Sequence, residues 1–106
     1  MKIFETLSKH EQKIIFECLC AAEKENFFSI WDFETLFGIY RNQLSAVRAA
    51  WPEVDMQDAV VSAAVMGALN QLLYYPHGQD AIWDQYISVQ PKVVQLILDK
   101  LIASGF

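Results

Sequence analysis

The sequence of 106 residues has little glycine and proline, with four residues of the first and three of the second. Collagen-like, low-complexity and turn-rich all-β chains need more of both, so these classes are excluded. Charged residues make up 20% of the chain and hydrophobic residues 54%, and this balance excludes a disordered chain. The length predicts one domain, 1–106, because two domains of half the size would each bury too small a core.

Cysteine is also scarce, and no segment indicates export or a membrane span. Cys18 and Cys20 lie two positions apart on an expected helix, where their side chains point about 200° apart and cannot pair. Residues 1–16 carry several charges and no cleavage site, so no signal peptide is predicted. The longest apolar run, 59–69, is interrupted by Ser62 and is shorter than the roughly 18 residues of a membrane span. We expect a cytoplasmic protein with reduced, partly buried thiols and no membrane partner.

The sequence has no catalytic or metal-binding motif. His10 and Glu11 begin like a zinc-protease helix, but Ile14 stands where the second histidine is required. The glycines are too scattered for a phosphate loop, and no nucleophile elbow occurs. We therefore expect no enzyme, no metal site and no cofactor. An enzyme or small-ligand binder with His77 beside a pocket remains a third hypothesis, after the two functions described below.

Positive charge is absent from a long stretch of the chain. Residues 49–91 contain no lysine or arginine, and the whole chain has a formal charge of −5. The acidic residues of this stretch are Glu53, Asp55, Asp58, Asp80 and Asp84. Nucleic-acid binding depends on neutralising phosphates, so this charge disfavours a nucleic-acid partner and favours a basic protein. The alternative is a solvated acidic surface that only aids solubility.

Helix signals recur in the first half of the chain. Ser8 and Glu11 have the spacing of a capping box, and an apolar stripe of roughly four helical turns follows. Ser29 has the position of an N-cap for a second, short helix. Gly38 ends that helix, since glycine adopts the left-handed conformation readily.

The middle of the chain predicts two further helices. One covers about 40–50 and ends before Pro52, which disfavours the α conformation at the preceding residue. The next is capped by Asp55, with Asp58 in its first turn. Its body, 59–69, is apolar nearly all round, which is typical of a helix buried at the centre of a bundle. The β-branched valines of this segment favour a strand, but its length and lack of alternation favour a helix.

The last third of the chain predicts a short helix and a longer one. Asp80 has the position of a cap for the short helix, which reaches Ile87. The longer helix begins at Ser88 or Gln90, and Gly105 ends it. The fold class is therefore all-α, a compact bundle of five to six helices in a single domain.

The segment Phe33–Trp51 resembles a helix-turn-helix. It has a short helix, Gly38 at the turn and an apolar stripe under a second helix. Glu34 occupies a position that is normally small, and the chain lacks the basic surface of a DNA-binding protein. The side chains that would read base edges are Arg41, Asn42, Gln43, Ser45 and Arg48. A DNA-binding regulator is therefore the alternative function.

Aromatic residues are numerous, and most of them, Trp31 included, are expected in the core. A subset near Asp80 and Asp84 could anchor a protein interface or could simply fill one end of the bundle. This subset is Tyr74, Tyr75, Trp83 and Tyr86. The surplus of aromatic side chains leaves a dimer open, and the oligomeric state is not predicted.

Three segments together resemble a known group of proteins. They are 27–38 (FFSIWDFETLFG), Trp51-Pro52, and 72–78 (LLYYPHG) followed by Trp83 and 86–88 (YIS). The pattern, which spans about 16–98, is similar to small bacterial immunity proteins of contact-dependent inhibition and other polymorphic toxin systems. The resemblance implies a cytoplasmic antidote that binds one cognate toxin domain, commonly a nuclease, and blocks its basic cleft.

The contact residues are predicted from charge and aromatic character, because the resemblance carries no binding motif. Asp80 and Asp84 are expected to pair with lysine or arginine of the toxin, and Trp83 and Tyr75 to supply apolar anchors. His77 lies between Tyr75 and Trp83 in the sequence and is also predicted to contact the toxin. Glu53, Asp55 and Asp58 are second-choice contacts, although Asp55 is better explained as a helix cap.

Overall fold

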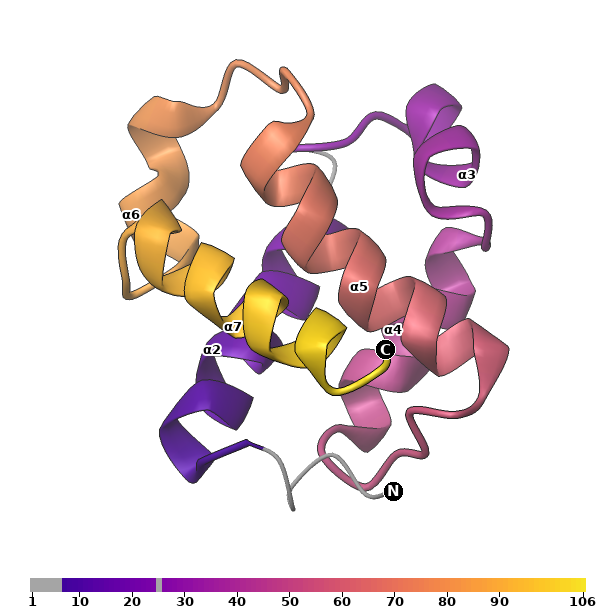
Figure 1. The fold of residues 1–106 in the computed structure, drawn as a ribbon. Helices are drawn as coiled ribbons and strands as arrows, with labels where there is room; N and C mark the ends of the chain where they lie inside the picture. The colour runs from indigo at the N-terminus through magenta and orange to yellow at the C-terminus, as the bar shows by residue number, and fades with distance from the viewer. Residues whose placement is uncertain (1–6, 25) are drawn as a thin grey trace.

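The computed structural model describes residues 7–24 and 26–106, and within them every regular element is helical. Six α-helices and one 3₁₀-helix follow one another along the described chain. Figure 1 shows how the helices are arranged. They are α2 (Lys9–Glu23), α3 (Ile30–Phe37), α4 (Arg41–Ala50), α5 (Ala59–Tyr74), η1 (Asp80–Ile82), α6 (Trp83–Tyr86) and α7 (Pro91–Ala103). All of them pack around one hydrophobic core. The predicted all-α fold of five to six helices is confirmed.

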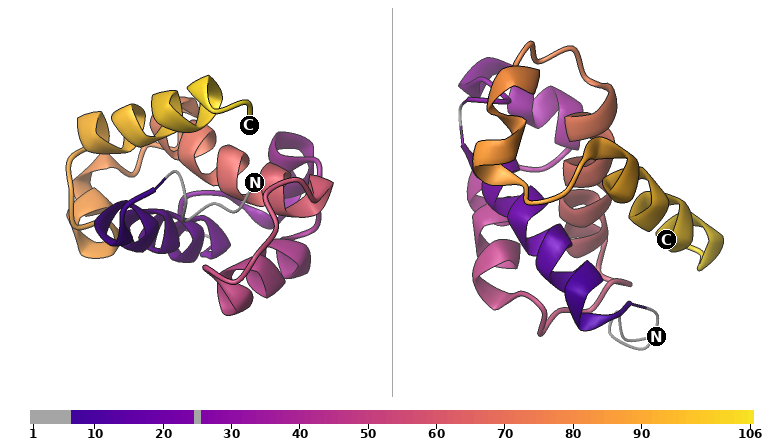
Figure 2. Two further views of the ribbon diagram at one scale, coloured as in Figure 1. Left: turned by 60° about the horizontal axis from the view of Figure 1, so that its bottom comes forward. Right: turned by 90° about the vertical axis from the view of Figure 1, so that its left-hand side faces the viewer.

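Helix α5 lies at the centre of the fold, as its apolar sequence predicts. It contacts α2, α3, α4 and α7, and in the left view of Figure 2 it lies between α7 and α2. Its small residues allow close packing: a Cβ atom added to Gly67 would lie 2.7 Å from the ring of Phe37 on α3. A side chain at position 67 would therefore push α3 away from α5.

The predicted helix ends of the first half are confirmed. Ser8 and Glu11 form the reciprocal capping box, with hydrogen bonds of 3.1 and 2.9 Å to each other's backbone N–H groups. The Ser29 hydroxyl accepts a hydrogen bond from the backbone of Asp32, and Gly38 ends α3 with a φ of 71°. These signals are local, since each cap joins residues within one turn.

Two predicted caps of the second half are wrong. The cap of α5 is Asp58, whose carboxylate accepts hydrogen bonds from the backbone of Val60 and Val61. Asp55 instead closes the preceding turn by accepting from the Gln57 N–H at 2.9 Å. Asp80 forms no side-chain cap, because it lies inside the first turn of η1 and Gln79 holds the cap position.

The long final helix begins after Gln90, with Pro91 at its first position, as one of the two predicted starts requires. Its C-terminal end projects from the rest of the fold in the right view of Figure 2.

None of the described helices is both long and apolar enough to cross a membrane. Both cysteines are free thiols, and burial raises the pKa of Cys18 and Cys20 above the ordinary value.

Candidate partner-binding surface

Several segments far apart in the sequence meet beyond the C-terminal end of α5. They are residues 26–29, helix α3, and residues 75–86; in Figure 1, α3 lies at the upper right and α6 at the left of the view. The Tyr75 hydroxyl donates to the Asp32 carboxylate at 3.0 Å, and the Tyr86 hydroxyl donates to Asn26 at 3.3 Å. We call this part of the molecule the acidic end. Most of the predicted contact residues belong to it.

The position of α3 at the acidic end is held by Arg41 of α4. Its guanidinium lies 4.4 Å from the centroid of the Phe33 ring. Two of the carbonyl groups that it binds are at the C-terminus of α2, where a helix leaves carbonyls unpaired and favours a cation. The acceptors are the backbone oxygens of Ala22 (3.2 Å), Glu23 (2.6 Å), Phe28 (2.6 Å) and Ser29 (3.3 Å). One side chain thereby joins α2, the connection to α3, and α4.

His77 is half-buried and has a structural role. Its Nδ1 accepts a hydrogen bond from the Gln79 N–H at 3.0 Å, so the ring proton lies on Nε2, which donates to the Leu72 carbonyl at 2.9 Å. The ring packs edge-on against Phe27, with centroids 4.9 Å apart. Both nitrogens are therefore engaged within the chain. This engagement disfavours a chemical role for His77 on a ligand, and its contact with a partner stays a prediction.

Trp83 does not supply the expected surface anchor, because its side chain is only 4% exposed. Its indole N–H donates to the Val89 carbonyl at 2.8 Å, which ties α6 to the start of α7. Helix α6 has a single turn, so its sequence carries too short a pattern to show which side faces the core.

Tyr75 is half-buried and lies at the edge of the acidic end. Its ring packs against Phe28, with centroids 5.7 Å apart, and its hydroxyl donates to Asp32. The hydrogen bond to this carboxylate raises the pKa of the Tyr75 hydroxyl above its ordinary value of 10.0. Tyr75 therefore helps to position α3 and offers only part of its ring to solvent.

Asp80 and Asp84, which were predicted to contact the toxin, have exposed carboxylates, and so does Glu34 on α3. None of the three has a hydrogen bond or ion pair with another of the residues that the structure describes. Segments 26–40 and 75–86 contain no lysine or arginine. Two cations border the first segment: Lys24, and Arg41, whose guanidinium binds the backbone carbonyls described above. The acidic end therefore presents uncompensated negative charge to solvent.

Glu53 and Asp58 lie at the opposite end of the molecule. Asp58 caps the first turn of α5, and Glu53 lies in the connection between α4 and α5. Helix α5 has 16 residues and is therefore about 24 Å long. The seven predicted contact residues thus do not form one surface, and Glu53 and Asp58 are separated from the acidic end by the length of α5.

Sequence reasoning missed the most exposed aromatic side chain of the acidic end. Trp31, which was expected in the core, is 88% exposed. The buried aromatics of α3 are Phe33 and Phe37, which lie on one face. Trp31 precedes Phe33 by two positions, or about 200° around the helix. The helical period alone could therefore have placed it outside.

Most of the side chains that a helix-turn-helix would use to read bases are engaged in contacts within the chain. Arg41 points toward the backbone carbonyls described above, and Arg48 pairs with Glu23 of α2. The Gln43 side chain accepts from the Tyr40 N–H at 2.7 Å, and Ser45 donates to the backbone oxygen of Arg41. Only Asn42 of the five lacks such a contact in the described chain. These contacts disfavour DNA binding through α4.

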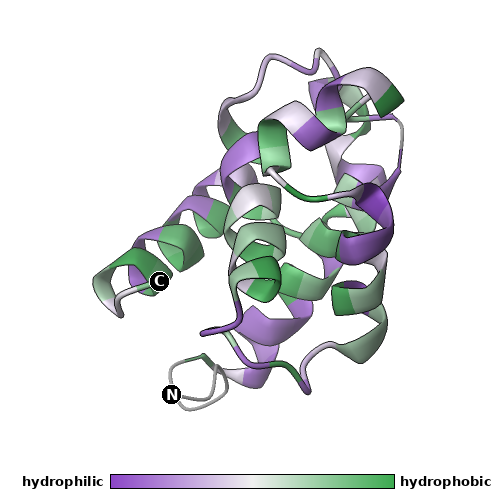
Figure 3. Cartoon of the chain, turned by 90° about the vertical axis from the view of Figure 1, so that its right-hand side faces the viewer, coloured by the Kyte–Doolittle hydropathy of each residue, from purple (hydrophilic) through white to green (hydrophobic). Residues whose placement is uncertain are grey.

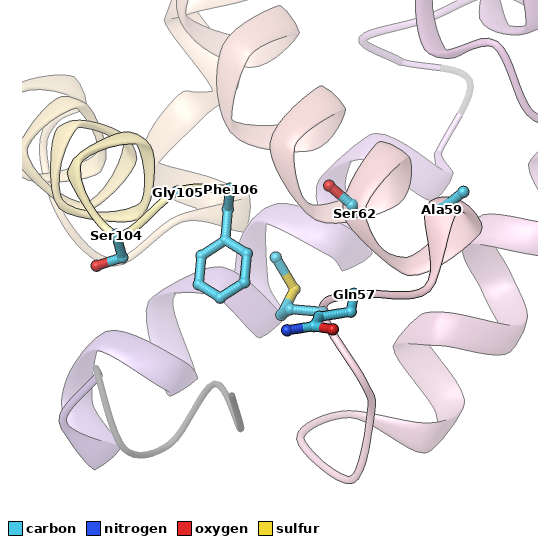
Figure 4. Close-up of a pocket in the computed structure, with 7 residues that line it drawn as sticks. Gln57, Ala59, Ser62, Ser104, Gly105 and Phe106 are labelled. Atoms are coloured by element: carbon cyan, nitrogen blue, oxygen red, sulfur yellow. The ribbon is translucent and has the colours of Figure 1, made fainter.

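A separate hollow of about 440 Å³ lies between the C-terminus and the start of α5, shown in Figure 4. It is lined by Met56, Gln57, Ala59, Ser62, Ser104, Gly105 and Phe106. None of these side chains titrates or can act as a nucleophile with an adjacent base. Nor do residues 7–24 and 26–106 contain a group of three or more His, Cys, Asp or Glu that could hold a metal ion.

Comparison with protein-family models, with curated proteins and with solved structures found no match for the chain. The resemblance to immunity proteins therefore stays a prediction. The acidic end carries both unpaired acidic side chains and, on α3, an exposed aromatic side chain.

Proposed function

We propose that the protein is an immunity protein that binds and neutralises a cognate toxin domain in the cytoplasm. The toxin is a nuclease, and the protein acts by occluding its basic active-site cleft. The observation that carries the proposal is the acidic end, where the carboxylates of Asp80, Asp84 and Glu34 are exposed and unpaired within the described chain. Glu34 shares α3 with the exposed Trp31. The sequence resemblance described above supports the same function.

The physical basis is complementary charge. A nuclease cleft must be positive because it binds phosphates. A negative surface is attracted to such a cleft before contact, and complementary potentials raise the association rate of protein pairs. The exposed carboxylates reach solvent without a competing intramolecular cation, so their charge is available to a partner. The tight helical core behind them provides a rigid support.

The test is direct binding and inhibition. The probe is the purified C-terminal domain of the protein encoded immediately upstream of this chain's gene. We expect a stoichiometric complex, loss of the domain's nuclease activity when the chain is added, and slower association at high salt. No complex, or a complex that leaves the activity intact, would contradict the proposal. Retention of the chain on DNA would favour the helix-turn-helix alternative instead.

The matched control for this experiment reverses charge at the acidic end without touching the core. The double variant Asp80→Lys and Asp84→Lys replaces two exposed side chains that make no hydrogen bond in the described chain. We expect this variant to fold normally and to inhibit the nuclease poorly. Equal inhibition by the variant and the wild type would show that the acidic end is not the inhibitory surface.

A further inference from the structure

Helix α3 presents apolar side chains that the fold does not bury. Trp31 is 88% exposed, and Ile30 beside it is 63% exposed. Tyr40, just after the turn at Gly38, is 60% exposed. Figure 3 shows hydrophobic and hydrophilic residues alternating along this helix, at the top of the view. Large apolar side chains that stay in water next to one another are typical of a protein-binding surface.

The three tryptophans of the chain differ in a way that singles out Trp31. The indole N–H of Trp51 donates to the Gln12 carbonyl at 2.9 Å, and that of Trp83 donates to Val89. The indole N–H of Trp31 has no hydrogen-bond partner among the described residues. Two tryptophans therefore bind backbone carbonyls within the fold, whereas the ring of the third is exposed and its N–H is free in the described chain.

A hollow of about 230 Å³ adjoins the α3 face. It is lined by Glu34, Gly38, Ile39, Tyr40 and Gln43. Glu34 follows Ile30 by four positions and Trp31 by three, so all three belong to one face of α3. This face therefore combines an exposed aromatic ring, an aliphatic side chain, an unpaired carboxylate and a depression that can receive a side chain.

We propose that this α3 face, formed by Ile30, Trp31, Glu34 and Tyr40, is the anchor that holds the toxin domain. The inference rests on the proposed function and adds where and by what chemistry the partner is held. Its occupant is a basic protein surface with an apolar pocket for Trp31 bordered by lysine or arginine. Interfaces concentrate their binding energy in such tryptophan contacts.

The charge of α3 selects this occupant. The helix carries Asp32 and Glu34 and no cation, and the guanidinium of Arg41 is held against the inner ring of Phe33. A second copy would bring the same carboxylates against each other, and a nucleic acid would bring phosphates of the same sign. A surface bearing lysine or arginine is attracted instead.

The α3 face is also rigid before the partner binds. Ser29 caps the helix, Arg41 holds its N-terminal connection, and Phe37 packs directly on Gly67 of α5. The Tyr75 hydroxyl fixes Asp32 from the opposite side. Binding therefore loses little conformational entropy at this site, which favours affinity.

The experiment compares Trp31→Ala with Leu96→Ala in binding to the same upstream-encoded domain. Leu96 is the control because it is 58% exposed on α7 and lies outside the acidic end. Both variants should keep the thermal stability of the wild type, since each removes an exposed side chain. We expect Trp31→Ala to raise Kd about 30-fold or more and Leu96→Ala to change it by less than about threefold.

Fluorescence provides a second readout of the same contact. Binding should shift the tryptophan emission of the wild type to shorter wavelength, and the difference should vanish in Trp31→Phe, whose complex gives the background of all other tryptophans. A complex of unchanged Kd in Trp31→Ala would overturn the anchor while leaving the proposed function standing. Absence of any complex with the wild type would overturn the proposed function, and the anchor with it.

Discussion

The two ends of α5 carry the same kind of residue and use it differently. At the start of the helix, Asp58 accepts hydrogen bonds from two backbone N–H groups, and Asp55 closes the turn before it. Beyond the other end, the side chains of Asp80 and Asp84 form no hydrogen bond within the described chain. The first pair of carboxylates stabilises local backbone, whereas the second pair only adds negative charge to the surface.

The comparison teaches that an acidic sequence does not by itself define a binding surface. Carboxylates that cap helices belong to the fold and are poor candidates for partner contacts. Those left unpaired next to an exposed aromatic side chain are better candidates, since charge speeds association and the apolar contact holds the complex. This criterion favours the acidic end, with Trp31, as the proposed interface over the connection that carries Glu53.

The largest expected effect is the loss of folding stability when Arg41, which holds the acidic end together, is replaced. Replacing Arg41 by methionine removes the guanidinium that donates hydrogen bonds to four backbone carbonyls. It should destabilise the fold by about 3 kcal/mol. Arg41→Lys keeps the charge but not the planar fork, so it should recover less than half of the loss. Urea denaturation measures both. Stability within about 0.5 kcal/mol of the wild type for Arg41→Met would show that this cluster is dispensable.

The next effect distinguishes the two ends by association kinetics. Asp84→Lys should slow association with the upstream-encoded domain about tenfold at low salt, because it reverses a charge on the attracting surface. Glu53→Lys makes the same charge change at the opposite end and should alter the rate much less. Stopped-flow measurements over a range of salt concentrations compare them. A larger effect at position 53 would move the interface to the other end of α5.

A smaller effect distinguishes the two ends by stability. Asp58→Ala leaves the first N–H groups of α5 without their acceptor and should cost about 1 kcal/mol. Asp80→Ala removes an unpaired surface carboxylate and should change stability by less than about 0.5 kcal/mol. Thermal denaturation of the two variants, side by side, gives the difference. Equal losses would mean that Asp80 has a structural role that the hydrogen bonds do not show.

The smallest effect concerns pH and involves neither end. Burial alone would raise the pKa of Glu11, but hydrogen bonds from Lys100 and Ser8 outweigh it and hold the pKa below its ordinary value of 4.5. The stabilisation is therefore present above pH 4.5 and is lost as the pH falls through the lowered pKa of the folded state. Glu11→Gln should be less stable than the wild type by under about 1 kcal/mol at pH 7.

The gap between Glu11→Gln and the wild type should narrow as the pH is lowered to about 3, where the wild-type carboxyl is also protonated. Urea midpoints at the two pH values test this. A gap of constant size would assign the effect to packing or to capping by the neutral amide.

The parts of the fold that could be predicted from the sequence are those set by residues close together in the chain. Ser8, Ser29 and Gly38 act within one helical turn, so their roles are legible in sequence. The sequence could not show whether Asp55 or Asp58 caps α5. Both residues have suitable spacing, and only the path of the backbone between them decides. The fold class followed from the repeated apolar stripes.

The candidate surface was less predictable because it depends on contacts across the fold. The sequence predicted toxin contacts at Asp80 and Asp84, whose side chains are exposed, but it also made Asp80 a helix cap, which is wrong. It assigned an aromatic anchor to Trp83, whose single-turn helix turns it inward. The exposure of Trp31 could have been inferred from its position opposite Phe33. The role of Arg41 could not, since its acceptors lie 12 to 19 positions away in the chain.

The most direct test of the central claim is hydrogen exchange of the chain alone and in complex with the upstream-encoded toxin domain. The amides of 26–40 and 75–86, which build the acidic end, should become protected on binding, while those of 51–58 and of α7 should not change. Protection confined to 51–58 or to α7, with the acidic end still exchanging freely, would contradict the assignment of the interface.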